Sequence, residues 1–407
     1  MIYLIPLLVA FSYQFNFCKP NFNLEPQPDG YFLIHSIIIF KHGHHAPIDK
    51  IPEKEIIWNC SSDNYLFPGG NPLNDDLVFT PQFKIKPIPE QSFLLGSCRA
   101  GELLEEGISQ IVNLADFLKQ KVYSSFIPSK FNRRFISFRS TYTNRCMASI
   151  QVLAHHLFPG IDPIDVFVAN EELESLIPNT YLCPTLNSIY ESVNQKNTTF
   201  MKKLSEYHKK LKKIKDESQI TAVPHWLRMA EYLSTLKCSN ISYPGTFTDN
   251  FLQQSSNILL DFFNEVTNYS TNPNGIKYCS GILFSEIYLG MRDFLSGRTD
   301  TKVIFICGHT LTFISLMSSL NLTLEWIPCA SYLSFDLLVK NESNKLNSQM
   351  IVLVHLNGRK VAQFDFKEFE KKALELRPTE KECNITYPFI EKDKKSQSTK
   401  FLLMSFS

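Results

Sequence analysis

The sequence predicts an α/β fold in which a mostly parallel sheet is flanked by helices and carries an α-helical cap insertion. Short apolar runs such as Ser36 to Phe40 and Lys302 to Cys307 are typical of buried strands, and segments with helical periodicity separate them. Residues 170–275 interrupt this alternation, because they hold several helical patterns and no convincing strand. Alternating strands and helices indicate a parallel sheet covered on both faces.

The expected elements follow in chain order. We expect a first core part over residues 31–169, the cap over 170–275, a second core part over 276–366 and a charged C-terminal tail over 367–407. Apolar runs predict strands at residues 36–40, 135–138, 166–169, 302–307, 332–339 and 350–356. Apolar residues at helical spacing predict helices at residues 101–121, 143–157, 280–295 and 311–320. Residues 50–98, rich in Pro, Asn and Gly, predict a long surface excursion.

The N-terminus resembles a targeting segment. Ile2 to Phe11 is apolar apart from one proline, which suits the core of a signal peptide, about 7–15 residues long. The run is too short to span a bilayer, which takes about 20 residues. We therefore expect a signal peptide over residues 1–17, cleaved near Phe17 or Cys18, and no membrane span in the mature chain. A buried N-terminal strand is the alternative interpretation of this run.

Composition narrows the class of protein. Hydrophobic residues make up 44% of the chain and aromatic residues 13%, which is ample for a buried core. The net charge of +1 gives no sign of a nucleic-acid partner or of an anionic membrane surface. A small phosphorylated ligand needs only a local positive pocket, so near-neutrality is compatible with one.

Cysteines and sequons favour a secreted or lumenal protein, with the Golgi and the lysosome among the destinations. The ten cysteines are scattered and form no C-x-x-C pair, which argues against a zinc ribbon and favours dispersed disulfides of unknown pairing. N-linked glycans are expected on seven sequons, at Asn59, Asn197, Asn240, Asn268, Asn321, Asn341 and Asn384.

Three predicted strand ends carry groups suited to phosphate. They are Lys41 to Pro47, Arg139 to Thr141, and Gly308 to Thr310. In sheets of this kind ligands bind at the carboxyl ends of the strands, and helix N-termini favour anions. If the strands are neighbours, these segments converge on one anion site. An imidazole in such a site can act as the nucleophile on a phosphate monoester, with cationic donors on the phosphate oxygens and an acid for the leaving alcohol.

These segments resemble motifs of the histidine acid phosphatases. Residues 40–47, FKHGHHAP, are similar to the family's R-H-G-x-R-x-P, and residues 139–145, RSTYTNR, match its R-S-T-x-x-x-R. Gly101 to Gly107 resembles a further family stretch, and so do Pro328 to Ser331 and Phe335-Asp336. The resemblance runs from about residue 31 to about residue 360. Within the family, the scattered cysteines and the long early loop are most similar to the branch that contains 2-phosphoxylose phosphatase.

The resemblance implies roles for site residues and also shows departures. It implies that His42 is the nucleophile, that Arg139 binds the phosphate as a clamp, and that His309 donates a hydrogen bond to a phosphate oxygen. Lys41 and His45 replace two phosphate-binding arginines of the family, and Thr310 replaces its acid/base aspartate. A hydroxyl is no acid at useful pH, and losing general-acid help costs about 10²–10⁴-fold in rate. His44 or a carboxylate of the helical insertion is a candidate replacement donor.

Two functions follow from this pattern. The first is a secretory-pathway phosphomonoesterase of the acid phosphatase type that acts through a phosphohistidine on His42. The second is an impaired pseudophosphatase that binds an anion or a partner. A metal cluster at His42 and His44 was the competing interpretation, because imidazole binds zinc and copper. The sequence shows no acidic or Cys partner nearby, so we predict neither a metal nor a cofactor.

Overall fold

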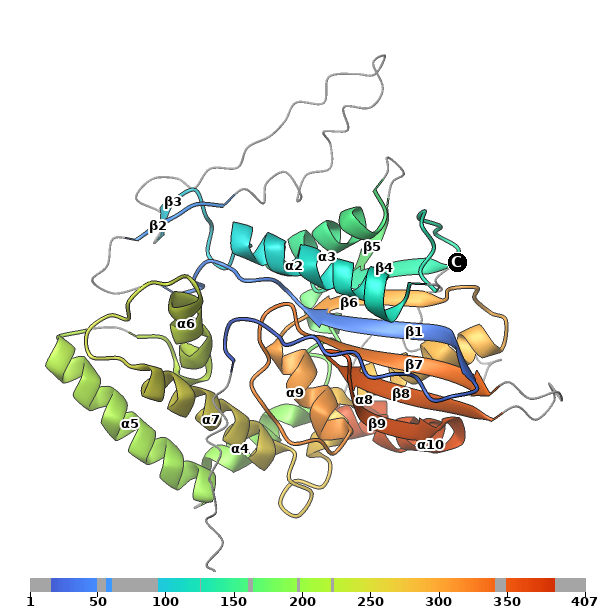
Figure 1. Cartoon of the computed structure of the whole chain (residues 1–407). Coiled ribbons are helices and arrows are strands. Elements are labelled where there is room, and N and C mark those ends of the chain that lie inside the picture. Colours follow the sequence, from blue (N-terminus) through green and yellow to red (C-terminus); the bar gives the residue numbers. More distant parts are fainter. Residues whose placement is uncertain are drawn as a thin grey trace, which may run out of the picture.

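The core of the molecule is a seven-stranded sheet (Figure 1). The computed structural model describes residues 16–49, 56–60, 94–124, 126–159, 164–195, 198–220, 223–340 and 349–384. The strand order is β5-β4-β6-β1-β7-β8-β9. Their bounds are β1 (Tyr31–Lys41), β4 (Ile136–Ser140), β5 (Val166–Val168), β6 (Val303–Gly308), β7 (Tyr332–Lys340), β8 (Met350–Leu356) and β9 (Arg359–Asp365). Each strand expected from the sequence is present, and the predicted α/β class with flanking helices is confirmed.

The sheet is mixed rather than mostly parallel, which corrects one detail of the prediction. Strands β5, β4, β6 and β1 pair in parallel, whereas β7, β8 and β9 add to β1 as antiparallel strands. Strand β9 was not predicted from the sequence. Its hairpin with β8 turns at Asn357 and Gly358, whose φ angles of 52° and 87° suit the Asn-Gly pair favoured in tight hairpins. Antiparallel neighbours need no crossover helix, so the strand–helix alternation ends there.

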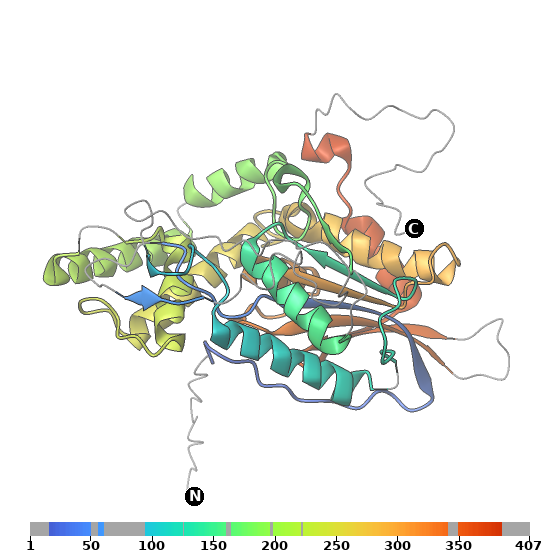
Figure 2. The ribbon, with the colours of Figure 1, turned by 90° about the horizontal axis from the view of Figure 1, so that it is seen from above.

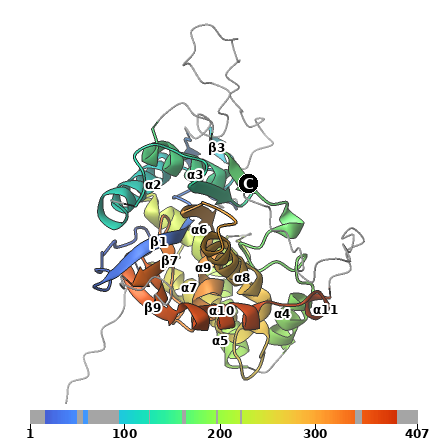
Figure 3. The same cartoon turned by 90° about the vertical axis from the view of Figure 1, so that its right-hand side faces the viewer.

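The sheet lies between two helical layers, and alternate side chains of strand β1 point into each of them (Figure 3). The side chains of Ile38 and Phe40 join the core beneath α2 (Glu105–Phe117), its π-helical continuation Leu118–Val122, and α3 (Asn144–Leu157). Ile37 and Ile39 face the other way, toward α8 (Gly275–Leu295) and α9 (Thr310–Ser319). All four side chains are at most 2% exposed. Burying each contributes about 1.5–3 kcal/mol, which explains why this strand is an uninterrupted apolar run.

The segment over residues 170–275 folds as helices gathered at one end of the sheet (Figures 1 and 2). It begins with the short 3₁₀ helix Glu171–Leu173 and continues with α4 (Thr185–Gln195), α5 (Thr199–Ser218), α6 (Trp226–Cys238) and α7 (Asp249–Val266). Thr198 and Thr248 cap α5 and α7 by accepting backbone N–H groups. Helix α7 contacts α9, and α4 contacts α8. The cap therefore rests on the helix that begins at the carboxyl end of β6.

The expected charged tail is in part an ordered element. Residues Phe366–Leu376 form α10, which contacts α8, β8 and β9. Phe369 and Ala373 lie one helical turn apart and are fully buried, while charged residues occupy the outer face. The chain then forms the short helix α11 (Glu380–Cys383), where Cys383 is disulfide-bonded to Cys183. The many charged residues of 366–376 mask the amphipathic period of this helix in the sequence. Residues 385–407 lie outside the described residues.

The expected dispersed disulfides are present. Three bridges join Cys18 to Cys238, Cys60 to Cys98, and Cys183 to Cys383. The first ties the start of the described chain to the end of α6, because Cys238 closes that helix. The second joins the two short strands β2 (Ile57–Trp58) and β3 (Leu95–Gly96), while residues 61–93 of the predicted excursion are not described. Among the described residues, no helix has the length and apolarity that crossing a bilayer requires.

Candidate active site

The three strand ends singled out in the sequence lie side by side. Lys41 at the end of β1 is in register with Gly308 at the end of β6, and Cys307 is in register with Ser140 at the end of β4. The backbone N–H of His42 donates to the carbonyl of Gly308 at 3.2 Å. The carboxyl ends of parallel strands therefore bring His42, Thr141 and His309 into one site, at the edge where such sheets bind ligands.

His42 is held in the tautomer that places its lone pair on Nε2. Its Nδ1 lies 2.9 Å from the carbonyl oxygen of Gly43, which only accepts, so Nδ1 carries the proton. The Nε group of Arg145, which only donates, lies 3.2 Å from Nε2 of His42. Burial is the main cause that lowers the pKa of His42 well below its usual value, and the charge of Arg145 lowers it further. His42 is therefore a neutral imidazole with its lone pair on Nε2.

Two glycines let the His42 loop lie directly against α2. A Cβ atom on Gly43 would stand 2.3 Å from the carbonyl oxygen of Gly107, and one on Gly107 would stand 2.1 Å from that of His44. Any larger residue at either position would push the loop from the helix. The side chains of Ser149 on α3 and Gln110 on α2 then accept the backbone N–H groups of Gly43 and His44. These contacts fix the loop that carries His42 and His45.

His309 lies beside His42, with ring centroids 5.3 Å apart. Its Nδ1 accepts from a terminal nitrogen of Arg145 at 3.3 Å, and its Nε2 lies 2.9 Å from the hydroxyl oxygen of Thr141. Because arginine only donates, the proton of a neutral His309 is on Nε2 and points to Thr141. His309 is the N-cap of α9, and Thr310 is the first helical residue, half-buried at that helix N-terminus. Free backbone N–H groups there favour an anion.

The structure separates the two arginines of the RSTYTNR segment. Arg139, predicted as the phosphate clamp, forms ion pairs with Glu286 at 2.9 Å and Glu174 at 3.3 Å. Burial alone would lower the pKa of Arg139, but these two carboxylates raise it, so its charge is already balanced. Arg145, in the first turn of α3, is the arginine that contacts both His42 and His309. The arginine at the last position of the motif contacts the two imidazoles, whereas the one at the first position was predicted to bind phosphate.

Lys41 is buried, and its ammonium group is hydrogen-bonded away from the imidazole of His42. Its ammonium donates to the carbonyl oxygen of Ile327 at 2.8 Å and lies 5.1 Å from the ring centroid of Trp326. A lysine keeps the positive charge but lacks the bidentate fork of an arginine. Its charge contributes to the low pKa of His42, after burial and nearer charges. Lys41 thus adds positive potential to the site from its edge.

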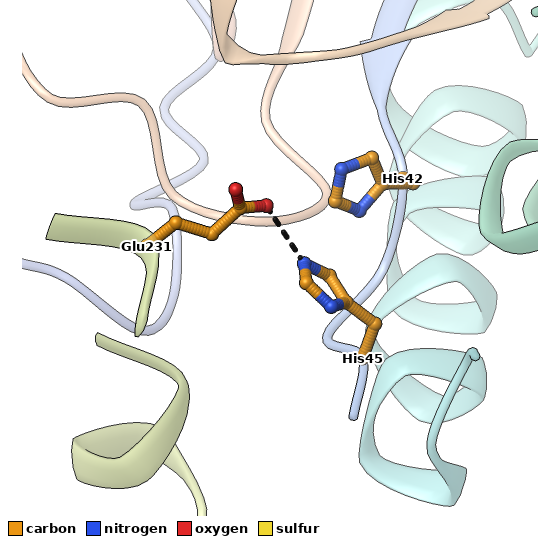
Figure 4. Close-up of side chains that lie close together, drawn as sticks. All are labelled: His42, His45 and Glu231. Carbon is orange, nitrogen blue, oxygen red and sulfur yellow. Dashed lines mark hydrogen bonds and ion pairs between the residues drawn. The ribbon is translucent and has the colours of Figure 1, made fainter. Parts of the chain in front are cut away.

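His45 forms an ion pair with Glu231, a residue of the cap that the sequence analysis did not identify (Figure 4). Its Nδ1 lies 2.7 Å from the carbonyl oxygen of Ala46, and its Nε2 lies 3.0 Å from Oε1 of Glu231. Both ring nitrogens therefore face acceptors, and only the imidazolium can donate to both. Burial alone would raise the pKa of Glu231, but the hydrogen bond and charge of His45 hold it well below its usual value. The pair is His45⁺ and Glu231⁻.

His44 is a weaker candidate for a replacement acid. Its Nε2 is 2.8 Å from the hydroxyl oxygen of Ser239, at the C-cap of α6. Burial, with smaller effects from the charges of His45 and Lys41, lowers the pKa of His44 to about 3. A neutral His44 ties the loop to the cap but has no proton to give at mildly acidic pH.

Positive groups surround the neutral imidazole of His42, which makes this a candidate site for an anion. Arg145, the N-terminus of α9 and His45 surround Nε2 of His42, whose ring centroid lies 4.9 Å from that of His45. A shallow depression opens toward His45 and Glu231 from the outside, lined also by Ile48, Asp49, Arg228, Tyr232 and Thr235. Fold and site thus define an α/β protein with a histidine-centred anion site at the strand ends.

Comparison with known proteins agrees with an α/β protein that has an anion site centred on a histidine. Residues 33–354 match the histidine phosphatase superfamily (branch 2), so the chain belongs to that family. Counting factor 60 of Dictyostelium discoideum is 24% identical over 371 residues, covering 82% of this chain and 86% of the relative. A Caenorhabditis elegans protein whose name places it among the acid phosphatases is 26% identical over 246 residues, covering 56% of each chain. Hafnia alvei phytase has the same fold, with a TM-score of 0.59 at 12% identity, over 89% of this chain and 100% of the phytase.

Proposed function

We propose that the protein hydrolyses phosphate monoesters through a covalent phosphohistidine on His42. The observation that supports this most directly is the tautomer of His42, whose Nε2 lone pair points at the guanidinium of Arg145. A nucleophile beside a phosphate-binding cation is what this chemistry needs. The acid phosphatase names among the relatives support the same class of substrate. No metal or cofactor is required for this sequence of steps.

In the first step, Nε2 of His42 attacks phosphorus, a P–N bond forms and the P–O bond to the alcohol breaks. Arg145 turns from Nε2 to the phosphoryl oxygens, where the α9 N-terminus adds backbone donors. The leaving oxygen takes the Nε2 proton of His45, whose imidazolium is already hydrogen-bonded to Glu231. His45 and Glu231 thus occupy the role of the acid that Thr310 cannot fill. The carboxylate comes from the helical insertion.

In the second step, water attacks the phosphohistidine and restores neutral His42. The neutral His45 left by the first step accepts the proton of that water, so the imidazolium re-forms and the protons balance. Glu231 holds the ring through its contact at 3.0 Å in the imidazolium state, before the first step and again after the second. Phosphate then leaves the site, and Arg145 returns to His42.

The test is hydrolysis of a generic aryl phosphate from about pH 4 to pH 7, with His42→Ala as the control. An activated leaving group needs little acid assistance, so turnover should be measurable and should depend on His42. Turnover that persists in His42→Ala would show that His42 is not the nucleophile. Binding of phosphate or vanadate without any His42-dependent turnover would show that the fold is an anion-binding pseudophosphatase. The replacement of the family's aspartate by Thr310 is the observation that favours this second function.

A secreted or lumenal location is part of the proposal. Three disulfides support an oxidising compartment. The sequon asparagines Asn59, Asn240, Asn268, Asn321 and Asn384 are exposed, as glycan attachment requires. Phe17 packs on Trp326 and Cys18 is bridged, so cleavage of the apolar leader is expected before Phe17. A mass decrease on peptide N-glycosidase treatment of protein from secreting cells would support this, and an unglycosylated protein with free cysteines would contradict it.

A further inference from the structure

We infer that His42, His45 and Glu231 form a binding site for one divalent transition-metal cation of the Zn²⁺ type. These residues each offer one ligand atom, and the three atoms lie within 4.8 Å of one another (Figure 4). Two imidazoles and one carboxylate with an open fourth position are a common ligand set for zinc. The inference concerns the free protein and does not depend on whether His42 turns over a phosphate ester.

The separation of the ligand atoms suits a single ion after a small adjustment. Zinc takes imidazole nitrogen and carboxylate oxygen at about 2.0–2.2 Å, so tetrahedral ligands lie roughly 3.3 Å apart. Nε2 of His45 and Oε1 of Glu231 are already 3.0 Å apart. Glu231 is the adjustable member, because its side chain is 33% exposed at the rim of the cap, whereas that of His45 is 3% exposed. Two of the three ligands, His45 and Glu231, line the shallow depression that opens to the outside.

The two histidines are oriented as metal ligands usually are. Nδ1 of His42 donates to the carbonyl oxygen of Gly43, and Nδ1 of His45 donates to that of Ala46, at 2.9 Å and 2.7 Å. Histidines that bind metals commonly donate their second ring N–H to a backbone carbonyl, which fixes the ring and directs the other nitrogen to the ion. Nε2 of His45 faces the carboxylate of Glu231, and Nε2 is the ring nitrogen of His42 that carries no proton. The metal would replace the proton shared by His45 and Glu231.

Nearby positive charge selects the kind of cation. Arg145 lies 3.2 Å from Nε2 of His42, and the charge of Lys41 also acts on this site, so an incoming cation meets repulsion and must displace the guanidinium. Hard cations such as Mg²⁺ and Ca²⁺ gain little from imidazole and are excluded by that repulsion. Zn²⁺, Co²⁺ and Cu²⁺ bind imidazole well enough to oppose it. Occupancy takes the lone pair of His42, so the metal and a covalent phosphoryl group exclude each other.

The test uses the full-length chain without a histidine tag, stripped of metal with a chelator. Co²⁺ is titrated while its visible absorption is recorded, and Zn²⁺ is then added to displace it. We expect one Co²⁺ per chain, with the intense absorption of four-coordinate geometry, and loss of this signal on adding Zn²⁺. His45→Arg and Glu231→Gln should each weaken binding at least about tenfold. Thermal unfolding of both variants is measured to check that any loss of binding does not come from loss of the fold.

The matched control is His156→Gln. His156 on α3 pairs with Asp116 on α2 at 2.8 Å, so it is another histidine–carboxylate pair but lies outside the predicted metal site. Its removal should leave Co²⁺ binding unchanged. Absence of a tetrahedral Co²⁺ signal in the wild type would overturn the inference, as would equal binding by His45→Arg and Glu231→Gln. Because the readout is spectroscopic, inactivity of the wild type toward phosphate esters would leave this result interpretable.

Discussion

The Nε group of Arg145 lies 3.2 Å from Nε2 of His42, and a terminal nitrogen of the same guanidinium lies 3.3 Å from Nδ1 of His309. One arginine thus connects the imidazoles that follow β1 and β6. Arg139, six residues earlier, is instead held by Glu174 and Glu286. The two side chains have opposite expected effects on activity and on stability, which makes them a matched pair.

Arg145→Ala should lower kcat by about 10²–10³-fold without a large loss of stability, because a cationic donor to the transition state is removed. Arg139→Ala should instead destabilise the fold by roughly 3 kcal/mol, because it leaves the carboxylates of Glu174 and Glu286 without their partner. Aryl phosphate kinetics and urea unfolding of both variants check this. The assignment would be reversed if Arg139→Ala were stable but inactive while Arg145→Ala kept its activity.

Thr310→Asp should raise activity on alkyl phosphates much more than on aryl phosphates. Position 310 begins α9 next to His309, so a carboxyl group there would lie at the same helix N-terminus that faces the proposed phosphate site. General-acid assistance is worth about 10²–10⁴-fold and matters most for poor leaving groups. Thr310→Asn, which matches the size but carries no acidic proton, is the control. Equal gains from both substitutions would show that a carboxylic acid at position 310 adds nothing to the acid that His45 supplies.

Activity should persist at mildly acidic pH instead of failing when an ordinary histidine is protonated. His42 acts as the neutral imidazole, and burial, followed by the charge of Arg145, holds its pKa well below the usual value of 6.5. The fraction of neutral His42 therefore stays high at about pH 5. The pH dependence of kcat/KM measures this directly. A tenfold fall per pH unit beginning near pH 6.5 would contradict it.

His35 should make the fold less stable in acid. Both of its ring nitrogens are buried without a hydrogen-bond partner among the described residues, and burial lowers its pKa to about 3. The unfolded chain binds a proton near pH 6.5 that the folded chain rejects, so stability present at pH 7 is lost as the pH falls below 6.5. The loss from this group is about 2 kcal/mol at pH 5.

His35→Leu should remove that pH dependence while keeping the contact with Phe294, whose ring centroid lies 5.2 Å from that of His35. Urea unfolding at about pH 7 and pH 5 should show a smaller difference for the variant than for the wild type. His155→Gln, a change at an exposed position of α3, is a control that should leave the difference unchanged. If the wild type and His35→Leu lost the same free energy of unfolding between these two pH values, His35 would not be a cause of the acid sensitivity.

The sequence predicted the strands well because each is an apolar run bounded by turns, and it predicted the convergence of His42 and His309 because parallel strand ends share an edge. It missed β9, although Asn357 and Gly358 are the residues that a tight hairpin favours. Glu231 had no local signal. Glu231 is 186 residues from His45 in the sequence. It reaches His45 because α6 packs over the strand ends, and no local sequence pattern predicts that contact.

The proposed mechanism requires that Nε2 of His42 becomes phosphorylated. Rapid acid-free quenching of the wild type during turnover of a phosphorus-32-labelled aryl phosphate, followed by alkaline gel separation, measures this directly. We predict label on the intact chain that survives alkali, is released by mild acid as phosphohistidine is, and is absent from His42→Ala. Turnover by the wild type without labelled protein, or label retained in His42→Ala, would contradict the account.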